Sequence, residues 1–269
     1  MRRSPHLPPT EQLLFQLALR DYDGDFRIWL PYRSSSMLSL LRNGAEIREG
    51  YLSDATCRTL LHDLEAYKAS HDLPLIERTE AGRSLRYRVI DGDRIFDSLP
   101  GIASLYRDVL ELVRQSDARL QPLSNQTASL NVNFTPPGGE YRWHYDRNAV
   151  TAILFLNTVE GGQTEMFPNY RVRLSRGKDT RIQRLCDNVL RRLARFGRPV
   201  VVDPVPGRMI LMRGDRCLHS VRAVEGNTER VSVIMSFDPP GEVFHAETDL
   251  DSYLYSQKAS ARRDPNYRA

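Results

Sequence analysis

The stretch Thr-Ala-Ser-Leu-Asn-Val-Asn-Phe-Thr at residues 127–135 decides the fold class. Polar and apolar side chains alternate along its whole length, which is the period of a β-strand with one polar and one apolar face. Asn131 and Asn133 lie on the polar face. Further short β-forming runs follow, separated by turns rich in Gly and Pro, and this spacing predicts a sandwich, barrel or jelly roll. These runs span 141–145, 150–156, 163–167, 199–205, 208–212, 217–223 and 230–237.

The part of the chain before this stretch has the apolar spacing of helices. Residues 11–20, a segment that begins at Ser53, and residues 102–114 are predicted to be helical, with Ser53 as an N-cap. One strand is expected over residues 85–90. We therefore predict an α+β protein whose double-stranded β-helix, or jelly-roll, core is supported by N-terminal helices. The expected divisions are a flexible arm over 1–10, a mostly helical support region over 11–125, the jelly-roll core over 126–240 and a C-terminal extension over 241–269.

One helix is predicted inside the β-rich half, over residues 179–196. Its apolar side chains recur at helical spacing, so we expect them to pack on the sheets while the arginines between them face solvent. The alternative is a lid or a partner-binding helix. The expected apolar stripe consists of Ile182, Leu185, Cys186, Val189, Leu190, Leu193 and Phe196.

Composition and charge exclude several classes of protein. Lys and Arg number 38 against 34 Asp and Glu, a net charge of +4 that is too small to indicate a nucleic-acid partner. No apolar run approaches the roughly 18–20 residues of a membrane helix, and the N-terminus has no apolar core of a signal peptide. Three cysteines cannot all pair with one another, which favours a reducing compartment. We expect a cytoplasmic protein without a membrane partner.

The tripeptide His144-Tyr145-Asp146 is the first candidate functional site. Residues two apart on an extended strand point the same way, so the imidazole and the carboxylate share one space. His219, inside the predicted strand 217–223, is a candidate third ligand. Two histidines and one carboxylate on one side of a metal leave three coordination positions open, as in non-haem Fe(II) oxygenases.

A second candidate site is Arg230-Val231-Ser232, on the next predicted strand. Period two puts Arg230 and Ser232 on one face, where a guanidinium fork and a hydroxyl suit a carboxylate. An arginine that points into a barrel needs an anion there, because a buried unpaired charge is too costly. We therefore expect a cosubstrate carboxylate beside Arg230.

Together these motifs resemble the Fe(II)/2-oxoglutarate-dependent oxygenases over about residues 127–238, and the prolyl-hydroxylase-like branch in particular. The Gly161-Gly162 and Pro206-Gly207 turns fall where that family has turns in its double-stranded β-helix. The resemblance implies a dioxygenase that uses O2 to hydroxylate an unactivated C–H bond and releases succinate and CO2. It implies that His144, Asp146 and His219 bind Fe(II) and that Arg230, Ser232, Asn131 and Asn133 contact 2-oxoglutarate.

Three positions narrow the resemblance within the family. Asp146 is present where related halogenases have a small residue, which favours hydroxylation. Arg230 stands where animal-type prolyl hydroxylases use Lys, so peptidyl-proline is not implied as the substrate. Ser236 stands where nucleic-acid demethylases carry a second Arg, which removes the main support for a nucleic-acid substrate.

The side chains around the metal motif lead to the expected substrate. Arg142, Arg147 and Asn148 flank the motif, and Glu165 follows the Gly-Gly turn. Counting every second residue back from the ligands puts Arg142 on the inward face, whereas the alternative is that these arginines face solvent. Both signs of charge near an iron site favour a small polar molecule with a carboxylate, such as a free amino acid or a natural-product intermediate. The alternatives are a peptidyl or protein hydroxylase and a non-catalytic jelly-roll binding module.

Overall fold

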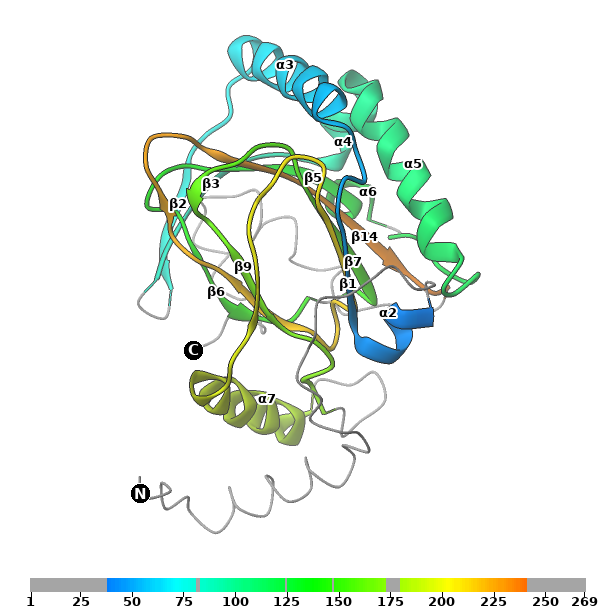
Figure 1. Ribbon diagram of the computed structural model, residues 1–269, viewed down its shortest axis with the longest axis vertical. Helices are drawn as coiled ribbons and strands as arrows, with labels where there is room; N and C mark the ends of the chain where they lie inside the picture. Colours follow the sequence, from blue (N-terminus) through cyan, green and yellow to red (C-terminus); the bar gives the residue numbers. More distant parts are fainter. Residues whose placement is uncertain (1–37, 81–82, 124, 147, 173–179, 241–269) are drawn as a thin grey trace.

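The computed structural model describes residues 38–80, 83–123, 125–146, 148–172 and 180–240 (Figure 1). The predicted arm over 1–10, the predicted helix over 11–20 and the extension over 241–269 lie outside the described residues. None of the described helices is long and apolar enough to cross a lipid bilayer. Cys57, Cys186 and Cys217 are all free thiols in the interior.

Two antiparallel sheets form the core and confirm the predicted α+β fold with a jelly-roll centre. The large sheet has the order β1 (Ala45–Arg48), β11 (Met209–Met212), β7 (Val150–Phe155), β14 (Arg230–Asp238), β5 (Leu130–Thr135), β3 (Arg83–Ile90) and β2 (Ile76–Glu80), with β4 (Gln121–Pro122) paired to β14. The small sheet has the order β10 (Val200–Val202), β9 (Thr164–Phe167), β12 (Leu218–Val221) and β6 (Tyr141–His144). A short ribbon joins β8 (Glu160–Gly161) to β13 (Val224–Glu225).

Helices cover the outer face of the large sheet, where α3 (Asp54–Ser70) and α5 (Pro100–Arg114) lie side by side (Figure 1). Ser53 caps α3 as predicted, because its side chain accepts a hydrogen bond from the backbone N–H of Thr56. The apolar stripe of α5 is buried against alternate residues of β14 and β5. This layer contains the larger hydrophobic core. Shorter helices are α2 (Leu38–Asn43), α4 (Gly92–Ser98) and α6 (Gln126–Ser129).

The inner face of the large sheet meets the small sheet across a second core. Ile153, Phe155 and Ile210 of the large sheet pack there against Met166 of β9. On the same inner face, cross-strand pairing places Asn131 opposite Ile234 of β14, and Ile234 in turn lies opposite Ile153. Opposite residues in a sheet share a face. The polar strip predicted for residues 131 and 133 therefore points between the sheets, and this gap holds the candidate site.

Some element boundaries and several short strands differ from the sequence analysis. The strand expected from Thr127 begins at Leu130, because Asn125 caps the short helix α6 by accepting from the N–H of Ala128. The strands β1 and β2 were not predicted in the N-terminal part. β1 has four residues and pairs with the distant strand β11, and β2 has five residues and pairs with the neighbouring strand β3. Both strands therefore depend on their pairing partners rather than on a pattern within their own few residues.

The predicted helix over 179–196 is α7 (Arg181–Leu193), followed by a 3-10 turn over Ala194–Phe196, but its buried face is rotated from the expected one. Ile182 is 63% exposed, Leu185 54% and Phe196 79%. The buried face contains Cys186, Val189 and Leu190 of the expected stripe, together with the polar side chains of Gln183 and Asp187.

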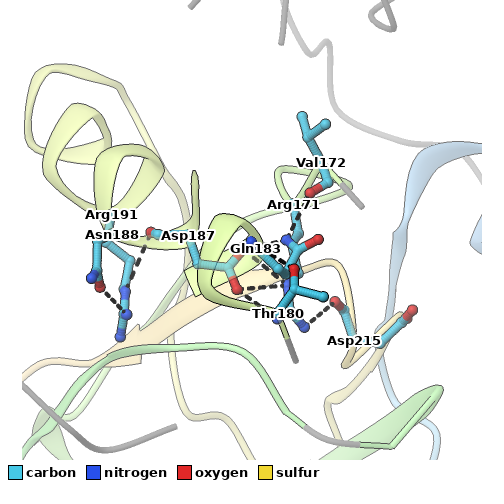
Figure 2. Close-up of polar contacts among 8 residues, drawn as sticks. All are labelled: Arg171, Val172, Thr180, Gln183, Asp187, Asn188, Arg191 and Asp215. Carbon is cyan, nitrogen blue, oxygen red and sulfur yellow. Dashed lines mark hydrogen bonds and ion pairs between the residues drawn. The ribbon is translucent and has the colours of Figure 1, made fainter. Parts of the chain in front are cut away.

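A polar network explains this rotation of α7 (Figure 2). Asp187 accepts hydrogen bonds from Nε of Arg171 at 3.0 Å and 3.1 Å, and Gln183 donates to Asp187 and to the Val172 carbonyl, each at 2.9 Å. The Thr180 side chain caps the helix by accepting from the N–H of Gln183. Because a buried carboxylate needs its partner, the Arg171–Asp187 pair fixes which side of the helix faces the protein.

Candidate metal and cosubstrate site

His144, Asp146 and His219 meet at one edge of the small sheet. His144 ends β6 and pairs directly with His219 of β12, while Asp146 follows two residues after His144. One ligand atom from each residue lies within 4.8 Å of the others. The Oδ1 atom of Asp146 is 3.6 Å from Nε2 of His144 and 3.5 Å from Nε2 of His219. Two imidazole nitrogens and one carboxylate oxygen thus converge on a space that could hold a divalent metal ion.

Backbone carbonyls set the orientation of both imidazoles. Nδ1 of His144 lies 2.8 Å from the carbonyl oxygen of Arg142, and Nδ1 of His219 lies 3.1 Å from that of Cys217. A carbonyl oxygen only accepts, so each Nδ1 carries the proton and each Nε2 presents a lone pair to the shared space. Burial, and then the neighbouring His219, lower the pKa of His144 to about 3. His144 is therefore neutral at pH 7, as a metal ligand must be.

Arg230 begins β14 and lies in the gap between the sheets. Its side chain donates to Ser232 Oγ at 3.1 Å and to Thr164 Oγ1 at 3.2 Å, and its guanidinium carbon lies 4.9 Å from the centre of the Phe155 ring. Within the described part of the chain, no carboxylate lies within ion-pair distance of it, and its Nε has no hydrogen-bond partner. Burial lowers the pKa of Arg230 to about 10. A buried guanidinium in such surroundings fits the carboxylate of 2-oxoglutarate.

Asn131 and Asn133 lie on the same face as this arginine. Asn133 is paired with Ser232 across the β5–β14 ladder, and Asn131 is two residues further along the strand. Both are buried, and Asn133 accepts a hydrogen bond from Thr135 Oγ1 at 3.2 Å. The structure thus brings together the four residues for which contact with the cosubstrate is expected.

Arg142 lies in an irregular part of β6. Tyr141 pairs with Val221 and His144 with His219, so three steps along β6 match two steps along β12, which is a β-bulge. Tyr141 and His144 therefore share a face, and the alternate-residue count that placed Arg142 beside His144 does not hold across the bulge. Burial lowers the pKa of Arg191 in α7, and the charge of Arg142 lowers it further. Arg142 is buried near both the metal site and α7.

The other expected substrate residues are placed differently. Glu165 pairs with Ser220 on the face of the small sheet opposite to His219, and it forms an ion pair with Arg222 at 2.6 Å. Asn148 is buried behind Asp146, where it hydrogen-bonds to Thr151. The structure does not bring these two side chains to the metal-binding side of the triad. Arg147 lies outside the described residues.

Three residues near the site were missed by the sequence analysis. Thr164 accepts a hydrogen bond from Arg230, and Thr151 donates one to Asp146. The phenol of Tyr141 raises the pKa of Arg230, against the larger lowering by burial. The Thr164 contact joins residues 66 positions apart, so only the strand register reveals it. For Thr151 a local signal existed, because it lies five residues after Asp146 at the start of an apolar strand.

Comparisons with known proteins agree with this geometry. Residues 130–237 match the model of the 2OG-Fe(II) oxygenase superfamily. Among curated proteins, none matches the chain significantly.

Solved structures with a similar fold include a Pseudomonas putida prolyl-4-hydroxylase, which is 22% identical, with 76% of this chain and 96% of that chain covered and a TM-score of 0.50. A Trichoplax adhaerens prolyl hydroxylase in complex with a peptide of hypoxia inducible factor is 16% identical over 86% and 91% of the two chains, with a TM-score of 0.52. The carbocyclase SnoK from nogalamycin biosynthesis is 13% identical over 76% and 84%, with a TM-score of 0.60. At these identities the likeness concerns the fold. The family match assigns residues 130–237 to the 2OG-Fe(II) oxygenase superfamily, and the cluster of His144, Asp146 and His219 within this stretch could hold a metal ion.

Proposed function

We propose that His144, Asp146 and His219 hold the Fe(II) and that Arg230, with Ser232, binds the distal carboxylate of 2-oxoglutarate. The observation that carries this assignment is the convergence of both Nε2 atoms on Asp146 Oδ1, at 3.5 Å and 3.6 Å, with both Nδ1 atoms already bonded elsewhere. The buried guanidinium of Arg230 has no counter-charge among the described residues, and an anionic cosubstrate would supply one, which supports the assignment of Arg230 to the carboxylate of 2-oxoglutarate. Asn131 and Asn133 are proposed as further polar contacts to the cosubstrate.

The reaction we propose is hydroxylation of an unactivated C–H bond. When bound, Fe(II) with 2-oxoglutarate and O2 supplies the oxidising power, so that one oxygen atom enters the substrate, the other enters succinate, and CO2 leaves. The protein contributes three neutral or anionic ligands, the guanidinium fork that orients the cosubstrate, and an interior lined by Ile153, Phe155 and Met166 that excludes water.

The substrate we propose is a small polar molecule with a carboxylate, such as a free amino acid or a natural-product intermediate. The buried cation of Arg142 near His144 supports an anionic group on the substrate. The similarity to the nogalamycin carbocyclase shows that this fold serves natural-product chemistry in at least one relative. A second candidate is a peptide substrate, which the Trichoplax enzyme bound to a peptide favours. Buried free cysteines are the support for a cytoplasmic location.

Succinate release tests this proposal. The full chain is loaded with Fe(II) and 2-oxoglutarate without oxygen, then exposed to O2 with free amino acids, carboxylated natural products, short peptides or apolar compounds. We expect substrate-dependent succinate only with small carboxylated molecules, and none from an Asp146→Ala variant under the same conditions. Turnover confined to peptides or to molecules without a carboxylate would overturn the substrate class and leave the iron assignment intact. Turnover by Asp146→Ala equal to the parent would overturn the assignment itself.

A further inference from the structure

The second oxygen of the Asp146 carboxylate is held by a neighbouring hydroxyl. Thr151, near the start of β7, donates from Oγ1 to Asp146 Oδ2 at 2.6 Å, and only 2% of the threonine is exposed. The other oxygen, Oδ1, is the one that faces the two histidines. One oxygen of the carboxylate therefore hydrogen-bonds to the protein, and the other faces the metal-binding space.

Asn148 fixes the direction of this hydrogen bond. Its Nδ2 donates to the carbonyl of Val150 at 2.6 Å and to Oγ1 of Thr151 at 2.8 Å. The carbonyl only accepts, so the nitrogen of the amide must lie on this side, and the threonine oxygen must accept from it. The single hydroxyl proton of Thr151 is then directed at Asp146. The resulting chain runs from amide to hydroxyl to carboxylate, and all three groups are largely shielded from water.

A glycine makes room for this arrangement on the backbone side. The N–H of Asp146 donates to the carbonyl of Gly214 at 3.0 Å. A Cβ atom at Gly214 would lie 2.6 Å from Thr151 Oγ1 and 2.9 Å from Asp146 Cβ, so any side chain there would push against both residues. The backbone and the side chain of Asp146 are thus held by separate partners that occupy one tight space.

We propose that Thr151 is a positioning residue that keeps Asp146 bound to the metal through one oxygen, with Asn148 orienting the hydroxyl. The inference rests on the proposed function, in which Asp146 is an iron ligand. A carboxylate that turned to bind through both oxygens would take one of the positions that a two-histidine, one-carboxylate site leaves open for cosubstrate and O2. The hydroxyl prevents this by engaging Oδ2, and it also draws electron density from the carboxylate. Partners of this kind orient metal ligands and tune the metal.

Cobalt binding to the full-length protein tests the role of Thr151 without relying on turnover. In Thr151→Val the side-chain shape is kept and the hydroxyl is lost, so we expect the Co(II) affinity in a chelator competition to change by about 10-fold, the usual scale for removing a hydrogen-bond partner of a metal ligand. The visible absorption bands of the bound Co(II) should also shift, because the number of carboxylate oxygens on the metal changes. Thr151→Ser keeps the hydroxyl and should restore both the affinity and the spectrum. Asn148→Asp, which removes the orienting donor, should show a smaller change of the same kind.

Matched controls separate this inference from the proposed function. Thr164→Val removes a buried hydroxyl from the Arg230 pocket and should leave the Co(II) spectrum unchanged, and thermal unfolding verifies that each variant is folded. If Thr151→Val binds Co(II) with the parental affinity and spectrum while Asp146→Ala loses Co(II), the role of Thr151 is wrong and the metal site stands. If Asp146→Ala itself binds Co(II) like the parent, the metal assignment fails and the inference fails with it. If Thr151→Val unfolds, Thr151→Ser and Asn148→Asp carry the test. The parental spectrum in Thr151→Ser together with a shifted spectrum in Asn148→Asp supports the role of Thr151, whereas a shifted spectrum in Thr151→Ser or the parental spectrum in Asn148→Asp overturns it.

Discussion

The metal end of the site, at His144, Asp146 and His219, and the arginine end, at Arg230, differ in how far their polar groups already have partners in the protein. At the metal end, the non-ligating atoms of His144, Asp146 and His219 already have partners, two backbone carbonyls and one hydroxyl. At the other end, the Arg230 guanidinium contacts two hydroxyls and a ring, and no carboxylate of the described residues pairs with it. The metal end is therefore ordered by its own protein contacts, whereas the arginine end stays electrostatically unbalanced until an anion binds. The metal end is therefore preorganised for a metal ion. At the arginine end, binding of an anionic cosubstrate should increase the stability of the folded protein.

Removing a ligand from the preorganised end should have the largest effect. His219→Ala deletes one of three proposed donors and leaves the rest of the site in place, so iron affinity should fall by more than about 100-fold, beyond the usual range for removing a hydrogen-bond partner of a metal ligand. Turnover should disappear with it. Metal analysis after equilibrium dialysis against Fe(II) without oxygen measures the loss. Full iron loading of both His219→Ala and His144→Ala would contradict the assignment.

At the unbalanced end, replacing the cation should stabilise the protein in the absence of cosubstrate. Burial lowers the pKa of Arg230 to about 10, well below the ordinary value of a guanidinium. Burying this charge therefore costs on the order of a few kcal/mol, partly offset by contacts with Ser232, Thr164 and Phe155. Arg230→Met fills a similar volume without a charge, so we expect the free energy of unfolding to rise by about 1–3 kcal/mol.

Thermal unfolding with and without 2-oxoglutarate completes this test. The parent protein should gain stability when 2-oxoglutarate is added in the presence of a metal, and Arg230→Met should gain none, because the cosubstrate would no longer find its cation. Arg230→Lys keeps the charge without the fork and should fall between the two. A strongly destabilised Arg230→Met with an intact response to 2-oxoglutarate would show that the two ends of the site do not differ in this way.

Acid should destabilise the metal-free protein through the preorganised end. The pKa of His144 is about 3 in the folded chain, lowered first by burial, against 6.5 in the unfolded chain. The unfolded state therefore binds more protons below pH 6.5, so the stabilisation from neutral His144 is present above that pH and is lost as the pH falls from 6.5 toward 3. Between pH 7 and pH 5 the loss should be about 2 kcal/mol. Urea unfolding of chelator-treated protein measures it, and His144→Gln, which gains no proton, should show a weaker dependence on pH.

The regular strands made much of this site predictable from sequence. Period two holds along β5 and β14, so Asn131, Asn133, Arg230 and Ser232 were all assigned to the face on which they lie. The three residues of the triad were also singled out from the sequence, because His144 and Asp146 are two residues apart and the distant histidine lies within a recognisable strand, although Asp146 itself follows the end of β6. In these places the backbone follows the local pattern, and the pattern alone gives the direction of each side chain.

Two places show where local pattern is insufficient. The bulge between Tyr141 and His144 adds one residue to β6, and the alternation of side chains in the sequence gives no sign of it. The direction predicted for Arg142 by counting alternate residues therefore does not hold there. The helices α5 and α7 give the second case. Both have apolar residues at helical spacing, yet α5 buries this stripe while α7 exposes Leu185 and buries Asp187. The partner of Asp187 is Arg171, outside the helix, so the buried face of α7 depends on tertiary contacts.

The smallest predicted effect compares two hydroxyls at the arginine end. Ser232 and Thr164 each accept one hydrogen bond from Arg230, at 3.1 Å and 3.2 Å, and both are buried. Removing one of these hydroxyls, by Ser232→Ala or by Thr164→Val, should weaken 2-oxoglutarate binding by about 1 kcal/mol, the net contribution of one hydrogen bond, because the guanidinium is then less firmly held. The KM for 2-oxoglutarate should rise by about 5-fold, since 1.4 kcal/mol corresponds to a factor of ten, while the Fe(II) affinity stays at the parental value. A change in Fe(II) affinity equal to the change in KM would show that the two ends respond as one unit, and the contrast between them would not hold.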